Sequence, residues 1–171
     1  MRYQQHLADQ IENMYKLDSL TMLYNRSGFL RAFDRMIKNN RVGAPLTVIL
    51  ADLDGLKQIN DKYGHGDGDI AIRTIADALK KSCPSDSLCV RFGGDEMLAV
   101  IPRLVNEADI RGKIQTYLEH MNALLDKPYT IATSLGVYVT EFSSNINFED
   151  LVRESDKLMY IDKMERKKNK N

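Results

Sequence analysis

Residues 91 to 98 read Arg-Phe-Gly-Gly-Asp-Glu-Met-Leu, so two glycines and two acids separate two apolar segments. A Gly-Gly pair between short β-like segments predicts a hairpin, because both glycines can take a positive φ without a Cβ clash. Asp95 and Glu96 would then lie where the second strand leaves the turn. Two adjacent carboxylates need a neutralising cation, so the hairpin tip is predicted to form half of a metal site.

The other half is predicted upstream, in residues 46–54. This nearly continuous apolar run ends in two acids, Asp52 and Asp54, as a strand buried on both faces would. A short helix is expected at 56–63, followed by a loop rich in glycine and carboxylate at 64–69. Carboxylates at a strand end and a lysine one helical turn later suit a magnesium nucleotide, because oxygen ligands bind Mg²⁺ and lysine binds phosphate.

Length and composition bound the class of protein. A chain of 171 residues is long enough for one domain with its own core, and 24 acids balance 24 bases, which argues against nucleic acid as a partner. No apolar run approaches a membrane span, so we expect no direct membrane contact. Cys83 and Cys89 are interpreted as reduced thiols of a cytoplasmic protein, which could be the cytoplasmic part of a membrane-anchored parent.

Residues 2–17 are expected to form a helix with a narrow apolar stripe. The stripe fits either a surface helix packed on its own domain or the end of a signalling linker that pairs with a second copy, and the pattern leaves both open. We therefore predict a boundary after this segment, with 1–17 as the N-terminal helix and 18–171 as the domain.

Helices and strands alternate along the rest of the chain, with strands of mixed direction. This order predicts an α/β (α+β) fold in which helices flank a central mixed sheet. The remaining expected elements are a helix at 28–39 capped by Ser27, a strand from Pro45, a helix at 70–82, a hairpin at 87–101, a helix at 106–126, a strand at 129–140, a helix at 148–164 and a frayed basic tail at 165–171.

Several motifs in order resemble the GGDEF domain family, the diguanylate cyclases that condense two GTP into cyclic di-GMP. The resemblance runs from Asp18 to Asn169. It rests on residues 18–26, 52–54, Lys57, Asn60-Asp61, Gly64-His65, Gly68-Asp69, residues 91–96, Ser134-Leu135-Gly136 and residues 158–160 with Lys163. It implies a ferredoxin-like palm, shared with other nucleotidyl cyclases and with polymerases.

The resemblance also implies a metal site. Asp52 and the backbone carbonyl of Leu53 would hold Mg²⁺, with Mn²⁺ as a substitute. Asp95 would also hold metal and would act as the base for the 3′-hydroxyl, and Glu96 would be a further ligand. Two cations can lower the pKa of that hydroxyl and absorb the charge of the leaving group.

Substrate contacts follow from the same resemblance. Lys57 would stabilise phosphate during catalysis, while Lys163 and Lys167 would reach the terminal phosphates. Position 167 is usually arginine in the family, and lysine keeps the charge but loses the bidentate fork. Asn60 and Asp69 would bind guanine, although both border predicted helices and, without the family, would be interpreted as helix caps.

A GGDEF domain supplies half of an active site, so the expected partners are GTP, a second copy of the domain and an upstream sensor domain. Residues 84–87 read Pro-Ser-Asp-Ser, where members with product feedback carry Arg-x-x-Asp, so tight feedback binding of cyclic di-GMP is not expected. The alternative function is a catalytically silent GTP-binding regulatory module.

Overall fold

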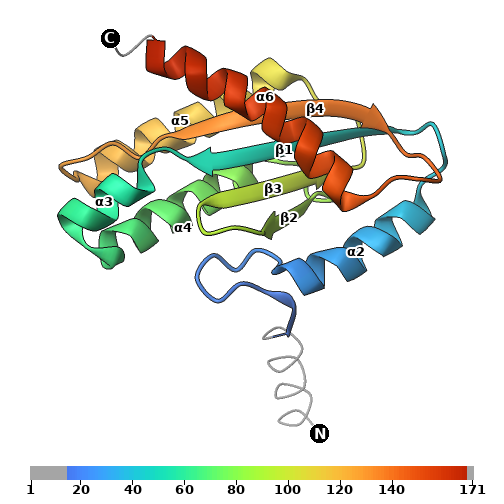
Figure 1. The fold of residues 1–171 in the computed structure, drawn as a ribbon, viewed down its shortest axis with the longest axis horizontal. Helices are drawn as coiled ribbons and strands as arrows, with labels where there is room; N and C mark the ends of the chain where they lie inside the picture. Colours follow the sequence, from blue (N-terminus) through green and yellow to red (C-terminus); the bar gives the residue numbers. More distant parts are fainter. Residues whose placement is uncertain (1–14, 169–171) are drawn as a thin grey trace, which may run out of the picture.

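The computed structural model describes residues 15–168 (Figure 1). The helix predicted at 2–17 lies outside these residues except for its last part. The elements, in chain order, are α2 (Arg26–Asn39), β1 (Pro45–Leu53), α3 (Leu56–Tyr63), α4 (His65–Ser82), β2 (Leu88–Arg91), β3 (Glu96–Ile101), α5 (Glu107–Leu125), β4 (Thr133–Glu141) and α6 (Phe148–Lys168).

The four strands form one sheet in the order β2-β3-β1-β4, which is the ferredoxin-like order. The expected α+β palm is therefore confirmed. The expectation of a mixed sheet is corrected, because all three strand pairings are antiparallel. β1 and β2 do run in the same direction, but β3 lies between them, so strands of like direction never become neighbours.

Side-chain alternation along β1 divides the core into two layers. Leu46, Val48 and Leu50 pack with residues of α2 and α6, while the intervening side chains pack with α4 and α5. In Figure 1, α6 crosses one face of the sheet over β1 and β4. Because the side-chain period of a strand is two, Asp52 falls on the same face as Leu50, below α6.

The glycine of β4 permits the close approach of α6. A Cβ on Gly136 would lie 2.0 Å from the carbonyl oxygen of Ser155 and 2.6 Å from the amide nitrogen of Met159. No side chain fits there without moving the helix. This contact brings the C-terminal half of α6 down to the end of β1.

Two predictions about where the first helices begin are wrong. Ser27 is not the cap of α2, because the side chain of Asn25 accepts the amide hydrogen bond of Gly28. The loop predicted at 64–69 is helical from His65 onward. Glycine and aspartate have low helix propensity, but packing of this first turn against α3 overrides it.

The C-terminal elements also differ from expectation. β4 begins at Thr133 and not at 129, because the side chain of Asn122 satisfies both the amide and the carbonyl of Ile131 at 2.8 and 2.9 Å. The basic segment expected to fray from residue 165 continues α6 to Lys168. Basic side chains in a last helical turn are favoured by the helix dipole.

The predicted hairpin is present as β2 and β3, but its glycines play a different part. The described glycines with positive φ are Gly43, Gly55 and Gly64, so neither glycine of the hairpin tip adopts that conformation. A Cβ on Gly93 would instead lie 2.6 Å from Oε2 of Glu96. A side chain at position 93 would therefore displace the Glu96 carboxylate, which folds back over the turn.

Candidate functional site

The ends of β1 and β3 bring the predicted metal ligands together. Asp52 and Glu96 are direct cross-strand partners, and both side chains lie on the face below α6. The amide of Leu53 donates to the carbonyl oxygen of Asp95 at 3.1 Å, which ties the hairpin tip to the end of β1. The two segments that carry acids therefore meet at one end of the sheet.

This crowding of carboxylates favours their neutral forms. Burial raises the pKa of Asp52, and the neighbouring charges of Asp95 and Asp54 raise it further, against the lowering effect of Lys163. Burial also raises the pKa of Glu96, with added repulsion from Asp52 and Asp95. A cation bound at this point would offset both the free-energy cost of burying the charged carboxylates and their mutual repulsion.

Lys163 supplies one such positive charge. Its Nζ donates to Oδ2 of Asp52 at 2.7 Å, whereas Oδ1 of Asp52 is buried and has no hydrogen-bond partner within residues 15–168. That orphaned oxygen fits a role as a metal ligand. Among the described side chains, however, no three His, Cys, Asp or Glu residues are grouped closely enough to hold a metal by themselves. Mg²⁺ commonly takes one or two carboxylates and completes its shell with water and substrate phosphate, so the donor set fits an ion that arrives with a nucleotide.

The two residues predicted to bind guanine, Asn60 and Asp69, lie on α3 and α4, two helices that pack against each other. Neither is a helix cap, since the cap residues are Gly55 and Gly64, and the capping interpretation is wrong. Oδ1 of Asn60 is buried and has no hydrogen-bond partner in the described structure. It lies against Gly68, where a Cβ would approach it to 1.9 Å, and Asp69 is the next residue. An unsatisfied amide oxygen can accept a hydrogen bond from a ligand.

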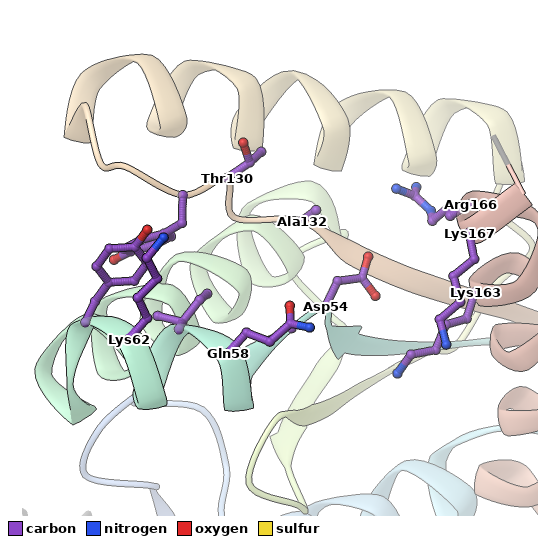
Figure 2. Close-up of a pocket in the computed structure, with 12 residues that line it drawn as sticks. Asp54, Gln58, Lys62, Thr130, Ala132, Lys163, Arg166 and Lys167 are labelled. Carbon is purple, nitrogen blue, oxygen red and sulfur yellow. The ribbon is translucent and has the colours of Figure 1, made fainter. Parts of the chain in front are cut away.

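A cavity of about 750 Å³ opens beside this end of the sheet, between α3, the segment before β4, and α6 (Figure 2). Three basic residues of α6 form one wall, and Lys62 lies on the opposite wall. Lys57 is exposed on α3 and does not line the cavity. The lining residues are Asp54, Gly55, Gln58, Ile59, Lys62, Tyr63, Tyr129, Thr130, Ala132, Lys163, Arg166 and Lys167.

The aromatic wall of this cavity was not predicted from the sequence. The rings of Tyr63 and Tyr129 pack with centroids 5.0 Å apart. The hydroxyl of Tyr129 donates to Asp67 at 2.6 Å, and Lys127 forms an ion pair with the same carboxylate. Hydrogen bonds from Lys127 and Tyr129 lower the pKa of Asp67. No sequence motif connects Asp67 with residues 127–129, so only the folded chain shows this link.

Comparison with known proteins defines the class to which this palm belongs. The family model described as "Diguanylate cyclase, GGDEF domain" matches residues 15–169, and the chain therefore belongs to the GGDEF family. The family resemblance found in the sequence is confirmed. Relatives named diguanylate cyclase connect the family to the synthesis of cyclic di-GMP.

Two curated relatives illustrate the match. The chain is 32% identical over 150 residues to diguanylate cyclase DosC of Escherichia coli K12, covering 86% of this chain and 33% of DosC. It is 28% identical over 155 residues to the uncharacterized protein YtrP of Bacillus subtilis, covering 90% of this chain and 26% of YtrP. The chain thus spans a third or less of each relative.

Solved structures agree on the fold. The GGDEF domain of TpbB (YfiN) from Pseudomonas aeruginosa is 28% identical, with a TM-score of 0.65 over 87% of this chain and 89% of that one. The coiled coil and GGDEF domain of DgcB from Caulobacter crescentus, in complex with c-di-GMP, gives a TM-score of 0.76 at 21% identity, covering 95% and 87% of the two chains. Within residues 15–168, no helix combines the length and the apolar character that crossing a membrane requires.

Proposed function

We propose that this chain is a diguanylate cyclase domain, which condenses two GTP into cyclic di-GMP and two pyrophosphates where two copies meet. The observation that carries the proposal is the convergence, at one end of the sheet, of Asp52 and Glu96 with a cavity whose α6 wall is basic. Carboxylates for a metal beside cationic groups for phosphate are the two parts that phosphoryl transfer requires.

The proposed reaction is an in-line displacement. The 3′-oxygen of one GTP forms a bond to the α-phosphorus of the other, the bond between the α-phosphorus and the bridging oxygen breaks, and pyrophosphate leaves. Asp95 accepts the proton of the 3′-hydroxyl, and Lys57 stabilises the phosphate charge. Because each domain holds one GTP, the same step must occur twice, once in each direction.

The remaining residues are divided between metal binding and phosphate binding. Asp52, Glu96, Asp95 and the carbonyl of Leu53 would hold Mg²⁺ or Mn²⁺, which when bound neutralises charge and lowers the pKa of the attacking hydroxyl. Lys163 and Lys167, both on the cavity wall, would contact the terminal phosphates.

Guanine would be selected by Asn60 and Asp69. A carboxylate accepts hydrogen bonds from N1-H and the exocyclic amine of guanine, whereas N1 of adenine is a bare acceptor and would repel it. The buried, unpartnered oxygen of Asn60 supports a ligand-binding role at this place.

The proposed setting is that of a module in a longer signalling protein. Curated relatives are about three times longer than this chain, which supports a sensor domain upstream of the helix predicted at 1–17. Dimerisation through that segment would bring two GTP-loaded domains face to face. GTP as substrate favours a cytoplasmic location.

The test is product analysis after incubation with GTP and Mg²⁺ at several protein concentrations. We expect cyclic di-GMP at a rate that rises with the square of concentration in the dilute range, loss of product in Asp95→Ala, and weakened GTP selectivity in Asp69→Ala. Asp77→Ala, an exposed aspartate later on α4, is the matched control. Binding of GTP without product, even in forced dimers, would instead establish a silent GTP-binding regulatory module.

A further inference from the structure

Asp162, one residue before Lys163, joins three segments of the fold. Its Oδ1 accepts from Arg111 of α5 at 3.0 Å. Its Oδ2 accepts from the amide of Leu135 in β4 at 2.8 Å and from Nε of Arg166 at 3.0 Å. The side chain is only 16% exposed, so these contacts replace most of its hydration.

These contacts cover the β4 edge of the sheet at Leu135. β4 pairs with β1 on one side only, which leaves backbone groups of Leu135 facing outward. Asp162 accepts from the amide of Leu135, and Arg111 donates to its carbonyl oxygen at 3.0 Å. The Asp162–Arg111 pair thus hydrogen-bonds the backbone N–H and C=O of Leu135, as a neighbouring strand would. It also fixes the C-terminal turns of α6 relative to β4.

Arg166 is the third group that donates to Asp162, and only its Nε takes part in this contact. Within residues 15–168, its two terminal nitrogens make no hydrogen bond, and the side chain lines the cavity. Figure 2 shows Arg166 extending from α6 on the same side of the cavity as Lys163 and Lys167. A guanidinium anchored through Nε presents the two-pronged edge that matches a phosphate group.

A structural ion pair alone does not account for this placement. Arg166 shares Asp162 with Arg111, which also pairs with Glu107 at 2.8 Å, and it lies on a cavity wall that also carries Lys163 and Lys167. Lys163 lies three residues before Arg166 and four before Lys167, and like charges at these spacings on a helix are unfavourable. A polyanion in the cavity would turn that repulsion into attraction.

We propose that Asp162 is a positioning residue that orients Arg166, and that Arg166 supplies the bidentate contact to the terminal phosphate of a nucleoside triphosphate. The inference rests on the proposed function and deepens it, because it assigns to Arg166 the bidentate phosphate contact that a lysine at position 167 cannot make.

The first test measures binding of GTP, GDP and GMP by calorimetry in Arg166→Gln, with Arg153→Gln, an exposed arginine earlier on α6, as the matched control. We expect GTP affinity to fall about tenfold or more in Arg166→Gln, with GMP affinity and melting temperature unchanged, because only the terminal phosphates reach the α6 wall. Arg166→Lys should restore part of the loss. Equal GTP affinity in wild type and Arg166→Gln, or an equal loss for GMP, would overturn the assignment.

The second test asks whether Asp162 acts through Arg166. Asp162→Asn should raise the KM for GTP more than it lowers kcat, and it should cost little further GTP affinity when added to Arg166→Gln. Additive losses would show that Asp162 affects binding by another route and would overturn the positioning role. A wild-type protein that binds no GTP would refute the proposed function itself, which is a different result from intact binding that is insensitive to Arg166.

Discussion

Nζ of Lys163 lies 2.7 Å from Oδ2 of Asp52, although 111 residues separate the two in sequence. The lysine therefore neutralises the carboxylate that a metal ion would also bind. Both side chains are mostly buried, at 31% and 10% exposure, so the pair is shielded from competing water. Binding of a divalent cation at Asp52 must weaken this pair and would free Lys163 for phosphate.

Lys163→Met should accordingly bind Mg²⁺ or Mn²⁺ more tightly when no nucleotide is present. We expect a gain of about fivefold, because the ion no longer competes with an ion pair worth about 1 kcal/mol. GTP affinity should fall in the same variant. Calorimetry with the metal alone and with GTP measures both, and Lys157→Met, an exposed residue of α6 paired with Glu154, is the control. Unchanged metal affinity would show that the pair does not compete with the ion.

Gly68→Ala should damage nucleotide binding without unfolding the domain. The new Cβ would lie 1.9 Å from Oδ1 of Asn60, so the amide must move, and a flexible side chain can do so at little cost in stability. We expect GTP affinity to fall about tenfold. Gly66→Ala is the matched control, because a Cβ there meets nothing within 4 Å. Equal GTP affinity in the two variants would argue against a guanine contact at Asn60.

Gly136→Ala should destabilise the fold itself. The atoms that a Cβ would strike belong to the backbone of α6, at Ser155 and Met159, and these cannot rotate away. We expect a loss of about 2–4 kcal/mol in the free energy of unfolding, measured with urea. Gly112→Ala in α5 has open space around the new Cβ and should stabilise by up to about 1 kcal/mol. A neutral Gly136→Ala would mean that α6 sits farther from β4.

Asp18 should make stability depend on pH. Burial favours its neutral form, but hydrogen bonds from Thr21 and the ion pair with Arg91 outweigh burial and lower the pKa of Asp18. A lowered folded-state pKa stabilises the fold above the unfolded value of about 3.9, and that contribution disappears as the pH falls through the folded pKa.

Asp18→Asn should therefore be less stable than wild type at pH 7, by about 1–2 kcal/mol, with the difference shrinking below about pH 4. Urea unfolding at pH 7, 5, 4 and 3 gives the comparison. Asp34→Asn, a change at an exposed aspartate of α2, is the control. A difference that stays constant down to pH 3 would show that ionisation of Asp18 contributes nothing.

Local sequence patterns predicted most of the elements. The apolar run ending at Asp52 is β1, the periodic segment after residue 106 is α5, and the Gly-Gly segment joins β2 to β3. Errors fell where a tertiary contact decides the local structure, as at Ile131, whose backbone is held by the side chain of Asn122. Propensity is a short-range property, so it does not register such contacts.

Motif spacing and apolar periodicity were enough to predict the family, the order of most elements and the residue types available for chemistry, because both are local properties of the chain. Which of those residues contact one another became clear only from the folded chain. It paired Asp52 with Lys163, set Asn60 against Gly68, and placed Arg166 on Asp162 at the cavity wall. Contacts between distant segments depend on how closely helices and strands pack, and that distance is set by side-chain volumes across the whole core.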